Sequence, residues 1–144
     1  MLGIGGREDR EGRREGCRGY RKLRIALIGP EIYPYKKGGI AVALYHLSRR
    51  LARKHTVTLI SAVKKQSGRM LIKRTGNFTL ITVKTLRWLK KPLSSLPLIL
   101  FTPILLLSRS PDIINAHQAG SPMVAATISS FLARSPLIIT CHAY

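Results

Sequence analysis

The feature that most constrains the fold is an alternation of short apolar runs with segments of helical periodicity. Residues 23–29 and 56–63 are rich in aliphatic and β-branched side chains, and each run is short enough for a strand buried on both faces. Between them, four apolar residues recur every three or four positions, as on one face of a helix. These are Ile40, Leu44, Leu47 and Leu51. A strand, a helix and a second strand in this order favour a parallel sheet.

Later apolar runs continue this pattern of short strands. Two of them, 70–73 and 78–83, are separated by a turn-forming cluster at 75–77, and only the later run is expected in the main sheet. Two more runs, 111–116 and 136–141, each begin with a proline, which suits the first position of a strand. The alternation therefore extends to the end of the sequence.

A second amphipathic helix is predicted between the last two strands. Ser121 followed by Pro122 is typical of an N-cap and a first helical position. An apolar stripe follows at Val124, Ile128 and Phe131. With 144 residues, 45% of them hydrophobic, the chain has enough apolar material for one core. We expect one α/β domain over residues 22–144, a Rossmann-like parallel sheet with helices on both faces.

The charge of the chain is strongly positive. Lys and Arg number 25 against 6 Asp and Glu, a formal net charge of +19, and no acidic residue occurs between Ile32 and Pro111. Such a charge favours polyanionic partners, which include nucleic acid, anionic lipid headgroups and phosphorylated small molecules. Composition alone does not choose among them.

The first 21 residues and the two cysteines indicate where the chain is located and whether it holds a metal or a cofactor. Residues 1–21 alternate glycine with charged residues and lack an apolar core, so we expect a disordered basic leader and not a signal peptide. The two cysteines, Cys17 and Cys141, form neither a metal-ligand spacing nor a disulfide framework. A reducing, cytoplasmic setting with no metal site and no cofactor is expected.

Segment 93–107 is unusually apolar. As a helix its fifteen residues would reach roughly 22 Å, short of the ~30 Å hydrocarbon core of a bilayer, and Pro97 and Pro103 are expected to interrupt it. One interpretation is a helix packed on the sheet, and the other is a segment that dips into a membrane. The packed helix is the preferred interpretation. The Trp flanked by cations at 87–91, a pattern typical of lipid interfaces, supports the second, which implies peripheral location at the inner membrane face.

Gly38 and Gly39 stand between the first strand and the first helix. Glycine allows positive φ and close approach of a ligand, and the N–H groups of the first helical turn favour a phosphate there. Neither a G-x-G-x-x-G fingerprint nor a Walker loop is present. The alternative is that the pair only eases the turn from strand to helix.

Two histidines follow the last two predicted strands. His117 and His142 each come where a strand ends, and an imidazole there can meet a substrate hydroxyl or a phosphate oxygen. If the strand order is the usual doubly wound one, both histidines and the glycine pair converge on one crevice. His46 and His55 lack this placement and are interpreted as structural or solvated.

Four segments resemble a known family. The segments 22–39, 43–60, 111–117 and 137–142 resemble, in order and spacing, the amino-terminal domain of family 4 glycosyltransferases. These are enzymes with two Rossmann domains (the GT-B type), similar in plan to glycogen synthase. The resemblance covers about residues 22–144.

The resemblance implies transfer of a sugar from a nucleoside-diphosphate sugar to an acceptor, with retention of configuration and no obligatory metal. In such enzymes the amino-terminal domain mainly holds the acceptor, here expected to be lipid-linked or a polysaccharide. Gly38 and Gly39 would be the loop glycines that face the donor phosphates. His142 would match the histidine that touches the donor sugar, and His117 a second recurrent position in the cleft.

The family's donor-binding domain, with its paired glutamates, has no counterpart in the sequence. We therefore expect this chain alone to be inactive, being truncated before that domain or partnered with a separate donor-binding chain. A non-catalytic basic module that binds a membrane or nucleic acid is one alternative. Nucleic acid is disfavoured, because aromatics are only 6% of residues and no reading motif is present. The other alternative is a membrane-anchoring subunit of a split glycosyltransferase.

Overall fold

The computed structural model describes residues 21–35, 38–64, 68–86 and 93–141. The predicted leader falls almost wholly outside them. The elements, in chain order, are β1 (Arg24–Gly29), α1 (Gly39–Leu51), β2 (Thr56–Val63), β3 (Met70–Thr75), β4 (Phe78–Lys84), the 3-10 helix η1 (Leu93–Ser95), α2 (Leu96–Leu107), β5 (Ile113–His117), α3 (Ser121–Ala133) and β6 (Leu137–Thr140).

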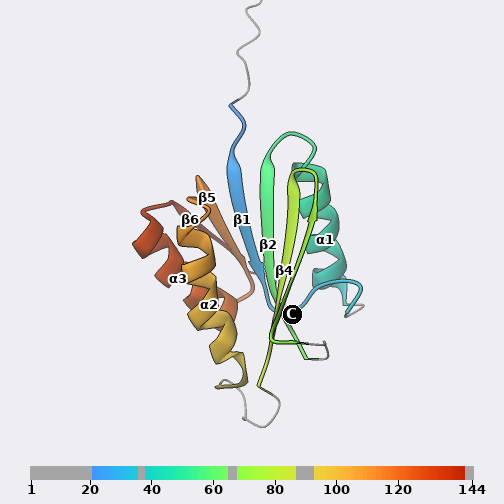
Figure 1. The fold of residues 1–144 in the computed structure, drawn as a ribbon, viewed down its shortest axis with the longest axis vertical. Helices are drawn as coiled ribbons and strands as arrows, with labels where there is room; N and C mark the ends of the chain where they lie inside the picture. The colour runs from blue at the N-terminus through green and yellow to red at the C-terminus, as the bar shows by residue number, and fades with distance from the viewer. Residues whose placement is uncertain (1–20, 36–37, 65–67, 87–92, 142–144) are drawn as a thin grey trace, which may run out of the picture.

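The strands form one sheet with the order β3-β4-β2-β1-β5-β6. All neighbouring pairs are parallel except β3 and β4, which are antiparallel. Helix α1 covers one face, and α2 and α3 cover the other (Figure 1). The predicted Rossmann-like α/β domain is therefore confirmed.

The prediction that the run 70–73 lies outside the main sheet is wrong, because this run is part of β3 and β3 belongs to the sheet. Gly76, with φ of +57°, lets the chain reverse between Thr75 and Phe78, so that β3 pairs with β4 along its whole length. Because β3 is an edge strand, most of its side chains are exposed, and its apolar pattern is too weak to predict sheet membership.

Two apolar layers hold the sheet between its helices. On the α2 and α3 side, aliphatic residues from four strands meet Leu98, Leu106 and Ala126. On the α1 side, Leu44 packs among Ile32, Leu59 and neighbouring strand residues. β1, β2 and β4 contribute residues to both layers and are thus covered on both faces, which explains the continuous apolar runs of β1 and β2.

Gly29, the last residue of β1, allows α1 to pack closely on the sheet. A Cβ at this position would overlap Cδ2 of Leu44, a residue that is only 1% exposed. The absence of a side chain at Gly29 therefore fixes the distance between β1 and α1, and with it the position of the α1 N-terminus.

The apolar segment 93–107 forms η1 and α2, and α2 packs against α3 and the sheet. Pro97 lies in the first turn, where its missing N–H leaves no helical hydrogen bond unmade. Pro103 lies inside α2 without ending it, so the expected interruption there is wrong. Pro103 is buried beside Thr102, and packing of this face supports the helix. Among the described helices, none combines the length and apolar composition needed to cross a bilayer.

Helix α3 differs from its prediction in two ways. Its N-cap is Gly120 and Ser121 is its first helical residue, so the helix begins one residue earlier than predicted. The predicted apolar stripe also faces outward, and Phe131 is 82% exposed. Small side chains face inward because they let α2 and α3 approach each other. These are Ala125, Ala126 and Ser129, together with Pro122.

A salt bridge joins the starts of β1 and β5. The Arg24 backbone N–H donates to Oδ2 of Asp112 at 2.8 Å, and the Arg24 guanidinium reaches both carboxylate oxygens. These hydrogen bonds, with the nearby charge of Arg21, lower the pKa of Asp112 below its ordinary value of 3.8. The carboxylate therefore stays ionised at neutral pH beside the amino-terminal edge of the sheet.

Candidate functional site

The carboxyl ends of β1 and β5 form the switch point of the sheet. The chain leaves β1 through α1 on one face to reach β2, and later returns through α2 on the opposite face to reach β5 (Figure 1). In open parallel sheets a crevice forms where connections part in this way, and ligands bind there. Gly38 and Gly39 follow β1, and His117 ends β5, so both lie at this edge as predicted.

The glycine pair begins α1. Gly38 is the N-cap with φ of −91°, and Gly39 is the first helical residue. The first helical hydrogen bond runs from Val42 N–H to the Gly38 carbonyl at 3.0 Å, which leaves the N–H groups before Val42 without a partner inside the helix. No acidic residue lies in this turn. The turn can therefore accept an anion.

The expected positive φ does not occur at Gly38, whose backbone is extended and open to any residue. A Cβ at Gly38 or Gly39 would meet nothing within 4 Å. The fold therefore does not require glycine at either position. What two glycines provide here is open space in front of the helix start.

The side chain of His117 is only 5% exposed, so it is more buried than expected for a residue that lines an open crevice. It stands level with Thr140, the last residue of β6, in the parallel β5–β6 pair. Thr140 Oγ1 is within 3.1 Å of Asn115 Oδ1 and donates to it, which joins the two strand ends. The imidazole is therefore held at the edge of the sheet by its strand and not by a loop.

Gln118 is a residue of this edge that sequence reasoning missed. Its φ is +83°, unusual for a residue with a side chain, and its N–H donates to the Thr140 carbonyl at 3.0 Å. Gly120 also has positive φ, of +104°, and precedes α3. Glycine adopts this conformation without strain, whereas Gln118 does not, and a strained residue of this kind is often found at a functional site. No pattern in the sequence signals it, because glutamine carries no preference for this conformation.

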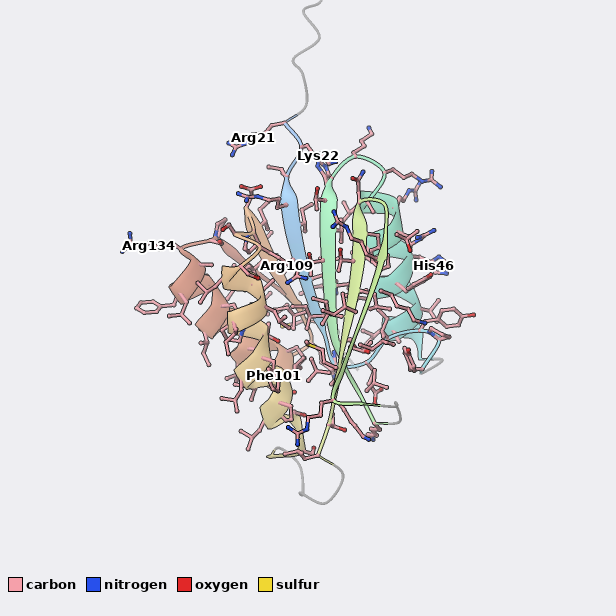
Figure 2. The ribbon with its side chains drawn as sticks, viewed as in Figure 1. Arg21, Lys22, His46, Phe101, Arg109 and Arg134 are labelled. Carbon is pink, nitrogen blue, oxygen red and sulfur yellow. The ribbon has the colours of Figure 1, made fainter. Side chains whose placement is uncertain are left out.

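The other predicted histidines are placed as follows. His142 lies outside the described residues, two positions after the end of β6. His55 accepts a hydrogen bond from the Leu23 N–H at 3.3 Å, as expected of a structural residue. His46 lies on the exposed side of α1, away from the switch point (Figure 2).

The start of α1 follows the end of β1, and the start of α3 follows the end of β5, in neighbouring strands. Both helices therefore direct N–H groups and the positive ends of their dipoles to the same edge. No group of three or more potential metal ligands occurs among the described residues. The chemistry available here is anion binding by backbone amides together with hydrogen bonding by an imidazole.

This architecture defines a Rossmann-like α/β domain in which α1 and α3 begin at the carboxyl edge of the parallel strands. The model of the family Glycosyltransferase Family 4 matches residues 37–144, and the chain belongs to that family as an amino-terminal domain. A comparison with curated proteins gave no match.

Solved structures with the same fold include three bacterial enzymes. An alpha,alpha-trehalose-phosphate synthase (UDP-forming) from Burkholderia vietnamiensis matches with a TM-score of 0.53 and 14% identity, over 83% of this chain and 32% of that one. Alpha,alpha-trehalose 6-phosphate synthase from Burkholderia multivorans matches with a TM-score of 0.53 and 17% identity, over 85% of this chain and 33% of that one. A putative UDP-N-acetylglucosamine 2-epimerase from Listeria monocytogenes matches with a TM-score of 0.54 and 11% identity, over 83% of this chain and 30% of that one. The chain thus spans about a third of each structure.

Proposed function

We propose that this chain supplies the acceptor side of a retaining glycosyltransferase that uses a nucleoside-diphosphate sugar. The observation that carries the proposal is that the α1 start, at Gly38 and Gly39, and His117 lie at the same carboxyl edge of the sheet, after the neighbouring strands β1 and β5. Family membership supports it, since residues 37–144 match a glycosyltransferase domain. The acceptor is proposed to be a lipid-linked sugar or a polysaccharide.

The chemistry follows from what sugar transfer requires. Negative charge grows on the diphosphate as its bond to the sugar breaks, and preorganised donors at that position lower the barrier. The amide groups at the start of α1 are such donors, and no carboxylate of that turn opposes them. His142 is proposed to contact the donor sugar, and His117 to hydrogen-bond a hydroxyl or phosphate oxygen. Together these groups would contact the donor from one side of its binding site.

The other side of the donor site is proposed to come from a second Rossmann domain with paired glutamates that bind the donor. Support comes from the share of the matched structures that this chain covers, which is about a third. That domain would come from the same polypeptide or from a separate chain. Without it, we expect this chain to bind diphosphate weakly and to transfer no sugar.

The Gly39→Ala variant tests the diphosphate contact. The added methyl group meets no protein atom, so stability should be unchanged or higher, since alanine favours helix. It would occupy the space proposed for a phosphate, and the pyrophosphate-induced shifts of the amide signals at residues 39–41 should shrink by at least about fivefold. The measurement is an NMR titration with pyrophosphate, and Ala43→Ser, on the exposed side of α1, is the control. Equal shifts in both variants would contradict the phosphate contact.

A peripheral membrane location is supported by the outer face of α2 and α3. The most exposed apolar side chains on it are Leu100 at 62%, Ile104 at 66% and Phe131 at 82%. Phe101 lies on the same helical layer, and Arg134 lies toward its upper end (Figure 2). Several exposed apolar side chains on these two helices, in a chain of net charge +19, suit an anionic bilayer.

The double variant Ile104→Ser with Phe131→Ser tests this location. Both side chains are mainly exposed, so the fold should persist, while membrane affinity should fall by about tenfold or more for two lost apolar contacts. The measurement is flotation with phosphatidylglycerol vesicles. The control is Leu47→Ser, an exposed site on α1, across the sheet. A chain that fails to float at low salt, or that self-associates through this face without binding vesicles, would contradict the proposal.

A further inference from the structure

A pocket of about 520 Å³ opens at the end of the sheet opposite to the candidate site. Its walls come from the amino ends of β1, β2 and β4, the carboxyl end of β3, and the residues around the end of α2. The polar lining consists mainly of three arginines and three threonines. These are Arg24, Arg74, Arg109, Thr56, Thr58 and Thr79.

The sheet register brings these residues together on one face. Thr58 is paired with Ala26 on one side and with Thr79 on the other, and Thr79 is in turn paired with Arg74. Thr58 shares the face of Ile60, which packs in the α2 and α3 layer, because alternate residues of a strand face the same way. A polar row therefore crosses the sheet where α2 has ended.

Threonine at these positions breaks the apolar pattern of the layer. Farther along β2, the same face carries Ile60 and Ala62, both in the apolar cluster. Thr58 is only 7% exposed, yet it places a hydroxyl where aliphatic side chains would pack. The neighbouring Thr56 and Thr79 are half-buried. A row of hydroxyls in an otherwise aliphatic layer suits a polar occupant more than core packing.

Positive charge exceeds negative charge around this pocket. Asp112 is engaged by Arg24 and lies near Arg21, so it offsets one guanidinium of the lining. Arg109 Nη1 donates to the Leu105 carbonyl at 3.1 Å, which satisfies one carbonyl at the end of α2 and leaves the other guanidinium N–H groups for a ligand. Arg74 makes no ion pair among the described residues. Figure 2 shows Arg109 between the helical layer and the strands.

We propose that this pocket binds the phosphate group of a phosphorylated ligand. Guanidinium groups match phosphate oxygens in a bidentate manner, and the threonine hydroxyls can donate to the same oxygens. Ile72 and Leu106 form an apolar flank beside them, where the next group of the ligand would lie. The site is separate from the switch-point edge, since parallel strands place their amino and carboxyl ends at opposite edges.

The test uses the full chain, pyrophosphate as the probe and backbone amide NMR at fixed salt. The signals of Thr58, Arg74 and Thr79 should shift together with one Kd. Arg74→Gln and Arg109→Gln should each weaken that Kd by about tenfold or more, the usual effect of losing a charge-assisted hydrogen bond. The matched control is Lys73→Gln, which removes the same charge from the next position of β3, paired with Leu80 of the α1-side layer. Lys73→Gln should leave the Kd for pyrophosphate within about twofold of that of the unaltered chain.

The outcomes separate this pocket from the proposed function. Loss of the shifts at Thr58 in Arg74→Gln, with any shifts at Gly39 unchanged from the original chain, confirms the pocket. This holds whether or not the switch-point edge binds pyrophosphate. Equal Kd values for Arg74→Gln and Lys73→Gln, or no shift at Thr58 and Thr79, would overturn it. Phosphatidic acid vesicles that displace pyrophosphate from the pocket would identify a lipid headgroup as the ligand. Vesicles that leave the pyrophosphate shifts intact would identify a soluble phosphorylated compound.

Discussion

Replacing His142 by alanine is expected to lower the turnover of the reconstituted two-domain enzyme by about a hundredfold or more. The imidazole is proposed to contact the donor sugar where its bond to diphosphate breaks, so its loss would affect the transition state more than substrate binding. The measurement is the initial rate of sugar transfer at saturating donor, with the midpoint of thermal unfolding determined alongside. We expect that midpoint to change little.

His117 provides a second variant for the same measurement. Because its side chain is 5% exposed, His117→Gln is preferred to alanine, which would leave a cavity at the edge of the sheet. Turnover should fall while the midpoint stays within a few degrees of the original. His46→Ala, at an exposed site of α1, is the control and should retain full activity. Normal turnover in His142→Ala would remove that residue from the site.

Gly29→Ala is expected to destabilise the domain by about 1 to 3 kcal/mol, as overpacking of a filled core usually does. The new methyl group would overlap Leu44 Cδ2, and Leu44 cannot easily turn away because it packs against Ile32 and Leu59. The free energy of unfolding is measured with urea. Gly39→Ala, where a methyl group inside the first turn of α1 meets nothing within 4 Å, should be no less stable than the unaltered chain.

A second substitution shows whether the loss arises from this contact. Leu44→Ala removes the overlapping group, so the double variant should be less destabilised than the sum of the two single variants. Additive effects in this cycle, or a Gly29→Ala chain as stable as the original, would contradict the close packing of α1 on β1.

The alternation of strands and helices was predictable because buried parallel strands and amphipathic helices differ in period. α3 shows where this reasoning fails. Its apolar residues occur around the whole helix, so periodicity could not tell that Ala125 and Ala126 face inward while Phe131 faces outward. That choice depends on how closely α2 approaches, which is a tertiary property. The pairing of β3 similarly depends on a turn and on edge hydrogen bonds more than on its own side chains.

The candidate site was predictable as far as strand ends determine it. Gly38, Gly39 and His117 lie at the edge that the sequence predicts, while the role of each and the position of His142 stay predictions. Gln118 was missed because its strained backbone arises from the β5–β6 pairing. The amino-edge pocket was missed for a related reason. Arg24, Arg74 and Arg109 are far apart in the sequence, and only the register of the sheet brings them together.

The most direct test of a shared diphosphate site is an amide shift map of the two-domain enzyme titrated with a nucleoside diphosphate. The signals of Gly38, Gly39 and His117 should shift with one common Kd, because the α1 start and the end of β5 lie at the same edge of the sheet. Shifts at the glycine pair without any at His117, or different Kd values for the two, would contradict a single site.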